Sequence, residues 1–222
     1  MRQRLLAGNA FCVHQRMGNV PPLEPTIRGC RICVEEPLQP RPLPHEPRPV
    51  LIMSHTARVC IAGQAPGARV HASGKPFDDR SGQRLREWMG VTPDQFYDRE
   101  RFAIVPMGFC FPGYDANGSD MPPRRECRTT WHDQVFAQMP QIELVLAIGS
   151  YSQRYHLGNA RMPSMTETVR RWRDHLYRNA PPAVLPIPHP SWRNTGWLRA
   201  NPWFEDEVVP ALRERVQTLA LR

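Results

Sequence analysis

Four cysteines carry the clearest chemistry in this sequence. Cys30 and Cys33 form a Cys-x-x-Cys pair, and Cys110 and Cys127 stand at the two ends of a polar segment rich in proline and glycine. A Cys-x-x-Cys pair either exchanges disulfides or holds a metal. Six prolines follow between positions 37 and 49, and they argue against the helix that a thioredoxin-like site requires. We therefore interpret the four cysteines as metal ligands, and their spacing alone suits zinc and a four-iron cluster equally well.

The remaining cysteines are not expected to be ligands. Cys60 lies in the apolar run ARVCIAG, which is typical of a buried strand, so its thiol is predicted to be a small core side chain. Cys12 lies in a segment without periodicity. An unligated thiol stays the alternative for Cys110 and Cys127 as well.

Apolar runs that alternate with helical patterns must position these side chains. The predicted strands are residues 58–62, 102–105, 144–148 and 184–188. The predicted helices lie near residues 81–89, 124–139, 166–178 and 202–220. This alternation predicts an α/β fold of three layers with a central, mostly parallel four-stranded sheet. We assign residues 51–222 to this domain, and residues 1–50 to an N-terminal extension that ends in a stiff, proline-rich connector.

Unusual residues follow the carboxyl ends of two predicted strands, where ligands bind in such sheets. The turn GQAPG at 63–67 follows the first strand, and its backbone N–H groups can approach a ligand closely. It matches neither a dinucleotide-binding pattern nor a P-loop, and taken alone such a segment is usually just a turn. Soon after it come Asp78 and Asp79, for which capping of the next helix is the ordinary explanation. His189 follows the last strand between two prolines, which restrict its backbone and so aim its ring.

The charge of the chain favours an anionic partner. The net charge is +8, and Lys75 is the only lysine, so arginine supplies almost all of the positive charge. Arginine suits phosphates and base edges because its planar fork donates two hydrogen bonds at once. The alternative explanation is a codon bias toward arginine, proline and alanine. No apolar run approaches the length of a membrane span, and no cleavage site follows the basic start, so we expect a cytoplasmic protein without a membrane partner.

Taken in order, these motifs resemble those of the uracil-DNA glycosylase superfamily. The likeness is closest to its iron–sulfur, thermophile-type branch, and it rests on CRIC at 30–33, GQAPG at 63–67, GKPF at 74–77, the two later cysteines and the HPS at 189–191. The matching motifs span roughly residues 27–219. The resemblance implies a [4Fe–4S] cluster held by Cys30, Cys33, Cys110 and Cys127, with zinc as the alternative, and a cluster that anchors the N-terminal segment on the α/β core.

The resemblance also implies a reaction. Such an enzyme extrudes a nucleotide from DNA, reads its base in a pocket and hydrolyses the N-glycosidic bond, as the first step of base excision repair. His189 matches the histidine that donates to the departing base. Asp79, and after it Asp78, is expected to hold the attacking water, with Gln64 helping to position water or base.

Further residues are assigned by the same likeness. Phe77 matches the aromatic residue that stacks on the flipped base. The remaining base-binding residues are Gly63, Gln64 and Ala65. The DNA-binding residues are Ser191, Trp192, Arg193 and Asn194, with Trp192 as a wedge in the emptied stack or, alternatively, a packing residue. The expected partner is single- or double-stranded DNA with a damaged base, most simply uracil, bound by a monomer.

One departure from the family concerns specificity. The iron–sulfur members carry an asparagine four residues before the third cysteine, and this chain has Pro106 there. Proline has no side-chain donor and no N–H. Either another residue reads the base, with Asn117 and Asn194 as candidates, or the specificity differs, toward relaxed specificity or a deaminated purine. The alternative function is an iron–sulfur protein of the same fold that binds DNA without turnover or is captured on it covalently. His71 lies in the region where a related branch carries the capturing histidine.

Overall fold

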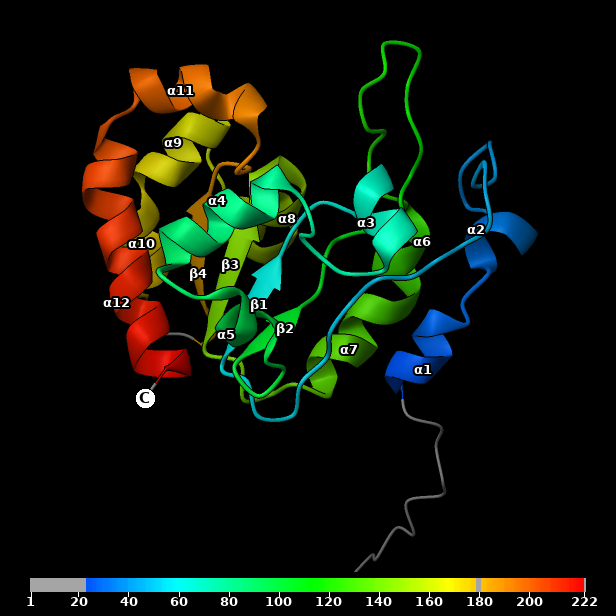
Figure 1. Cartoon of the computed structure of the whole chain (residues 1–222), viewed down its shortest axis with the longest axis horizontal. Coiled ribbons are helices and arrows are strands. Elements are labelled where there is room, and N and C mark those ends of the chain that lie inside the picture. The colour runs from blue at the N-terminus through cyan, green and yellow to red at the C-terminus, as the bar shows by residue number, and fades with distance from the viewer. Residues whose placement is uncertain (1–22, 179–180, 222) are drawn as a thin grey trace, which may run out of the picture.

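Four apolar runs form one parallel sheet in the computed structural model, which describes residues 23–178 and 181–221 (Figure 1). The strands are β1 (Val59–Ala62), β2 (Phe102–Ile104), β3 (Leu144–Ile148) and β4 (Ala183–Ile187), in the order β2-β1-β3-β4. Every strand residue is buried, because helices cover both faces of the sheet. The predicted mostly parallel four-stranded sheet is confirmed, and each predicted strand lies within one or two residues of its observed bounds.

Helices form a layer on each face of the sheet. Val59 and Ile61 of β1 point into a core with α4 (Arg80–Met89), α9 (Met165–Arg170), α10 (Trp172–Leu176) and α12 (Val209–Ala220). Cys60 and Ala62 point into the opposite core with α1 (Leu23–Arg28), α7 (Asp133–Ala137) and α8 (Gly149–Leu157). Figure 1 shows α9, α10 and α12 on one side and α1 and α7 on the other. The alternation along β1 thus gives the three predicted layers.

Shorter elements connect these layers. They are α2 (Ile32–Glu35), α3 (Ala68–Ser73), α5 (Pro93–Tyr97), α6 (Arg125–Cys127), the π-helical η1 (Arg128–His132), the 3-10 turns η2 (Gly158–Ala160) and η3 (Trp192–Asn194), α11 (Thr195–Ala200) and the π-helical η4 (Phe204–Val208). The predicted helix 124–139 is continuous but contains η1, and the predicted helix 166–178 divides into α9 and α10. Sequence patterns missed α8 because Ser152 and Gln153 are buried on it, where an amphipathic helix would carry apolar residues.

The described part of the N-terminal extension packs on this domain. Leu23 and Ile27 of α1 belong to the second core. The end of the proline-rich connector runs along β2, where Ile52 and Ile104 exchange backbone hydrogen bonds of 2.9 and 2.8 Å. This contact covers an edge of the sheet that would otherwise stand open. Cys12 lies outside the described residues. Among the residues that are described, no helix is long and apolar enough to cross a bilayer.

Cys60 behaves as the sequence predicts. Its side chain is fully buried in the second core, and burial raises the pKa of its thiol to about 12. Such a thiol is unreactive at neutral pH because only the thiolate is a nucleophile or a ligand. Cys60 therefore provides an unligated reference for the other cysteines.

Two histidines, the buried His132 and the half-buried His156, pack in an aromatic cluster. His132 is fully buried, and its Nε2 donates to the carbonyl oxygen of Pro106 at 3.1 Å. His156 packs edge-on against Tyr155 and Phe136, and its Nε2 is buried without a hydrogen-bond partner in the described structure. Burial lowers the pKa of His132 to about 4 and the pKa of His156 to about 3. Both rings are therefore neutral in the folded protein at neutral pH.

These histidines predict that the protein loses stability in mild acid. The unfolded chain takes up protons near pH 6.5, whereas the folded chain does so only near pH 4 and 3, so stability falls as the pH drops below 6.5. Each ring contributes on the order of 2 kcal/mol of this loss at pH 5. Urea unfolding at pH 7 and pH 5 measures it. His156→Phe should reduce the loss by about 2 kcal/mol, and the exposed His55→Ala should not change it. An unchanged loss in His156→Phe would contradict the assignment.

Candidate active site

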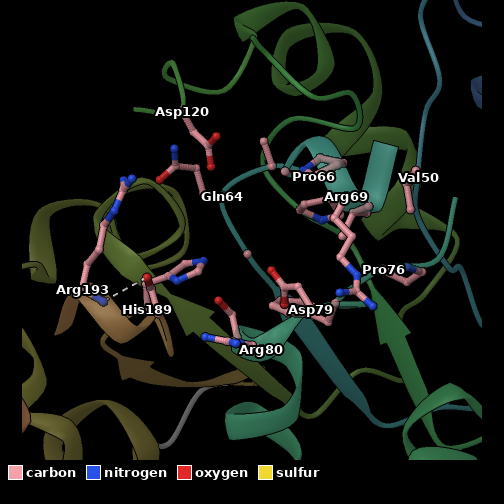
Figure 2. Close-up of a pocket in the computed structure, with 18 of the residues that line it drawn as sticks. Val50, Gln64, Pro66, Arg69, Pro76, Asp79, Arg80, Asp120, His189 and Arg193 are labelled. Carbon is pink, nitrogen blue, oxygen red and sulfur yellow. Dashed lines mark hydrogen bonds between the residues drawn. The ribbon is translucent and has the colours of Figure 1, made fainter. Parts of the chain in front are cut away.

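A cavity of about 540 Å³ opens at the carboxyl edge of the sheet (Figure 2). The turn after β1, the loop before α4, the loop after β2 and the segment after β4 line it. Of the predicted site residues it brings together Gly63, Gln64, Ala65, Phe77, Asp79, His189, Ser191, Trp192 and Arg193. It does not include Asp78 or Asn194. Segments far apart in the sequence meet here because parallel strands end at the same edge.

The ring of Phe77 forms the floor of the cavity beside Gly63. A Cβ atom at Gly63 would lie 3.2 Å from Cζ of Phe77, so glycine lets the ring lie against the backbone of the turn. The ring also packs against Phe96 in a T-shaped arrangement, with ring centroids 6.0 Å apart. Phe77 is half-buried and lines the cavity. Its ring is therefore held in place and still available to a planar ligand.

Phe77 has a strained backbone, with a φ of 54° that non-glycine residues seldom adopt. Its carbonyl oxygen accepts hydrogen bonds from the Tyr97 hydroxyl and from Nη1 of Arg86, both at 3.3 Å. The Tyr97 hydroxyl also lies 3.0 Å from the carbonyl oxygen of Pro76. Gly82 of α4 packs directly on this peptide, because a Cβ atom there would lie 1.8 Å from the Phe77 oxygen. The surrounding structure thus imposes the strain, as is common at functional sites.

Asp79 has two roles in the structure. Its Oδ1 accepts a hydrogen bond of 2.8 Å from the backbone N–H of Gly82, so it caps the N-terminus of α4 as the sequence alternative proposed. It also lines the cavity, where Figure 2 shows it facing the space beside His189. Capping fixes the carboxylate and leaves its second oxygen toward the cavity. Asp78 does not line the cavity.

The backbone of His189 is held by residues that flank it in the chain. The Asn194 amide donates to its carbonyl oxygen at 2.7 Å, and the prolines on either side restrict the chain. Burial lowers the pKa of His189, and the carboxylates of Asp79 and Asp120 act in the opposite direction. A lowered pKa keeps the imidazole neutral at pH 7, so one ring nitrogen can donate a hydrogen bond into the cavity.

Asp120 is a cavity residue that the sequence did not indicate. It comes from the loop after β2, and Figure 2 shows its carboxylate near Gln64 and the side chain of Arg193. Loss of solvent raises the pKa of Asp120, and the charges of Arg193 and His189 partly offset this. In the sequence, the only indication of Asp120 was that an acidic residue lies within a proline- and glycine-rich loop. The Gln64 amide is oriented by a 3.5 Å hydrogen bond to the carbonyl oxygen of Met121.

The rim of the cavity is basic and carries an exposed tryptophan. Arg69, Arg80 and Arg193 line it, and the first two were not predicted from sequence. Trp192 is 69% exposed, and the guanidinium of Arg193 lies 5.9 Å from its ring centroid. The packing alternative for Trp192 therefore does not apply, because Trp197 and Trp203 pack on each other instead. Such a rim suits a polyanion with unstacked bases.

Comparison with known families agrees with this site. Residues 52–213 match the family model described as Uracil DNA glycosylase superfamily, which is most of the chain. The chain belongs to the uracil DNA glycosylase superfamily. Members of this superfamily are DNA glycosylases, hydrolases of DNA repair that act on DNA. The matched region begins after Cys30 and Cys33, so the match does not identify the iron–sulfur branch.

Pro106 stands where the resemblance to the iron–sulfur members predicts an asparagine. Pro106 lines the cavity, and its carbonyl oxygen accepts from His132. Neither sequence candidate for the missing amide lines the cavity: Asn117 lies on the exposed part of the loop after β2, and the Asn194 amide is bound to His189. His71 does not line it either, because its ring packs 4.4 Å from the ring of His45. Gln64 is the amide that does line the cavity.

The four predicted metal ligands come from three separate segments. Cys30 and Cys33 flank the start of α2, Cys110 follows β2, and Cys127 ends α6. The Cys33 and Cys127 thiols hydrogen-bond to each other, and Cys110 lies close enough to Cys30 and Cys33 to feel their charge. All but the half-buried Cys30 are buried. Four thiols thus interact at one place.

Metals bind cysteine as the thiolate, so the pKa values of these thiols bear on metal binding. The hydrogen bond from Cys127 lowers the pKa of Cys33, whereas that contact and burial raise the pKa of Cys127. Burial raises the pKa of Cys110 to about 12. Within the described residues no three His, Cys, Asp or Glu side chains already stand in a metal-binding arrangement. Four sulfur donors in a buried place nevertheless match the donor set of zinc or an iron–sulfur cluster.

Proposed function

We propose that this protein is a monofunctional DNA glycosylase that extrudes a damaged nucleotide, most simply deoxyuridine, and hydrolyses its N-glycosidic bond in base excision repair. The observation that carries the proposal is the juxtaposition of Phe77, Asp79 and His189 around one cavity with a basic rim. The cavity lies inside the region that matches the superfamily. It offers an aromatic surface for a base, a neutral donor and a carboxylate, which are the groups that this hydrolysis needs.

The proposed division of labour follows from charge. The departing base becomes anionic, and the neutral imidazole of His189 donates a hydrogen bond to it. The sugar becomes cationic, and the carboxylate of Asp79 faces it and holds the attacking water. Gln64 lines the cavity and binds the base edge or that water. Asp120, close to His189 and Arg193, is the second carboxylate that can hold water in this cavity, whereas Asp78 does not line it.

The DNA contacts are proposed from the rim. Ser191, Trp192 and Arg193 follow His189 on the exposed segment after β4. The exposed Trp192 would enter the gap left by the extruded base, and Arg193 would bind a backbone phosphate. Asn194 is a positioning residue, because its amide binds the carbonyl oxygen of His189.

The chain does not place a lysine for strand cleavage. A bifunctional glycosylase forms a Schiff base through an amine, and Lys75 is the only lysine. Its ammonium group lies 4.0 Å from the ring centroid of Tyr97 and does not line the cavity. Water is therefore the proposed nucleophile, and the expected product is an abasic site in an intact strand.

Labelled uracil-containing oligonucleotides, single- and double-stranded, test the proposal on a denaturing gel. The expected result is strand cleavage that requires alkali, since the enzyme leaves an abasic site. Cleavage without alkali would contradict the monofunctional assignment. Intact oligonucleotide at every enzyme concentration would overturn uracil as the substrate, and other deaminated bases would then be compared in the same assay.

Pro106 favours a second candidate function, a DNA-binding protein that has lost turnover. A buried amide normally rejects the wrong base, and Pro106 supplies none. This candidate predicts binding to uracil-containing DNA without an abasic product. A slow band that resists denaturant would instead indicate covalent capture. His71, turned away from the cavity toward His45, does not favour that outcome.

We further propose that Cys30, Cys33, Cys110 and Cys127 hold a [4Fe–4S] cluster, with zinc as the alternative metal. Bound there, the metal would tie the N-terminal extension to the core, because two ligands precede the connector and two belong to the domain. Iron, sulfide and zinc analysis of the purified protein is expected to find iron and sulfide. Cys127→Ser should lose them together with the visible absorption, and Cys60→Ala, which changes a core thiol, should retain both. Equal metal content in the two variants would contradict the ligand set.

A further inference from the structure

A second cavity, of about 620 Å³, lies on the other side of the loop that follows β2. Met107 lines it, next to Pro106 of the first cavity, and so do Pro122 and Pro123, which closely follow Asp120 of the first cavity. Figure 1 shows this loop projecting beyond the sheet and returning to the start of α6. One loop is therefore a common wall of the two cavities.

The second cavity is positively charged. Arg125 and Arg128, one helical turn apart on α6 and η1, line it from one side, and Arg154 of α8 lines it from another. In the part of the chain that the structure describes, these three guanidinium groups have no ion-pair or hydrogen-bond partner. Arg124 differs, because it is buried and paired with Glu126 at 2.5 Å. No acid in this region of the described chain forms an ion pair with these three arginines, so their guanidinium groups are available to an anionic ligand.

Other groups at this cavity limit what it can bind. Tyr151 and Tyr155 lie four residues apart on α8, so both rings are on the same face of the helix. The Tyr155 hydroxyl lies 3.5 Å from a carboxylate oxygen of Asp133, which does not line the cavity itself. Leu38, 64% exposed, and Pro40 add apolar surface. Aromatic and proline faces accept a base, and arginines accept phosphates, so the combination suits a nucleotide better than a simple anion.

We propose that the second cavity binds an unpaired nucleotide of the same DNA strand whose target nucleotide occupies the first cavity. The inference rests on the proposed function, and it adds a contact on one side of the target only. Two cavities that share a wall can hold neighbouring parts of one strand, with the loop after β2 between them. The base would stack against Tyr151 or Tyr155, and its phosphates would bind Arg128 and Arg154.

Fluorescence anisotropy with undamaged single-stranded oligonucleotides tests this contact without requiring catalysis. Arg128→Gln/Arg154→Gln is compared with Arg58→Gln/Arg99→Gln, which removes the same charge at the amino edge of the sheet, where both residues are exposed. The test variant should weaken binding of a long strand about tenfold and reduce the magnitude of its log–log salt slope by about 1.4, as expected for two phosphates on a single strand. The control should change neither appreciably.

Oligonucleotides with a target uracil near one end locate the contact. Strands extended only to the 5′ side, or only to the 3′ side, should differ in their response: the test variant should weaken one set and leave the other at the wild-type affinity. Equal weakening of both sets, or a loss equal to that of the control variant, would overturn the proposal, because the arginines would then act only through net charge. Tyr151→Ala/Tyr155→Ala should weaken the same set, and Tyr151→Phe/Tyr155→Phe should not.

Two further measurements separate the possible failures. The first is competition by a mononucleotide against the bound strand, in the wild-type protein and in Arg128→Gln/Arg154→Gln. If the mononucleotide displaces the strand from the wild type at far lower concentrations than from the variant, the cavity binds a free nucleotide, and the strand proposal is overturned. If no damaged base is excised but one-sided strand binding is lost in the test variant, the proposed catalysis fails and the second cavity stands. If excision occurs and binding is unchanged, the proposed catalysis stands and the second cavity fails.

Discussion

Replacing His189 by alanine is expected to lower the rate of base excision by about 10² to 10⁴ while DNA binding changes little. The reason is that the neutral imidazole stabilises charge that appears on the base only as the bond breaks. Single-turnover excision and anisotropy, measured on the same oligonucleotide, separate the two quantities. The fall should appear in the rate at saturating protein and leave the dissociation constant within a few-fold of wild type.

Two variants make this result specific to the imidazole. His189→Asn keeps an N–H donor at a similar place and should recover part of the lost rate. His55→Ala removes an exposed histidine outside the cavity and should behave as wild type. A rate for His189→Ala within threefold of wild type would show that another group stabilises the departing base. A parallel loss of DNA binding would assign His189 a binding role instead.

Adding a single methyl group at Gly82 is expected to be the most damaging small substitution near the site. The new Cβ atom would lie 1.8 Å from the carbonyl oxygen of Phe77 and 2.7 Å from its carbonyl carbon, so this strained peptide would have to move. Since Tyr97 and Arg86 hold the same oxygen, their hydrogen bonds would be lost as well. We expect Gly82→Ala to destabilise the protein by about 3 kcal/mol, the upper range for overpacking, and to displace the ring of Phe77.

Urea unfolding and single-turnover excision measure the two consequences of Gly82→Ala. The matched control is Gly196→Ala on α11, where a Cβ atom would meet nothing within 4 Å. Alanine in an unobstructed helix should stabilise by about 0.5 to 1 kcal/mol relative to glycine, so the control moves in the opposite direction. Wild-type stability and activity in Gly82→Ala would mean that the contact between α4 and the loop of Phe77 does not constrain the site.

The four strands could be inferred from the sequence because each is a short apolar run followed by a turn, and their parallel pairing because helical patterns separate them. A strand that is buried on both faces is a continuous apolar run, so it can be recognised in the sequence without knowledge of the neighbouring strands. His189 and Asp79 were recognisable for a related reason: each follows a strand or opens a helix, so local chemistry set it apart. The helix α8 was missed because its buried Gln153 donates to the carbonyl oxygen of Ile187, a contact that no local pattern contains.

Tertiary structure alone decided which of the candidate residues share the cavity. It separated Asp79 from its neighbour Asp78, because capping of α4 turns one carboxylate toward the cavity and leaves the other outside it. It added Asp120 and Arg69, which come from a loop and a helix with no distinctive sequence pattern. Sequence determines the elements through local periodicity and turn chemistry. The membership of a site depends on contacts between residues far apart in the chain, and only the packing of those elements creates them.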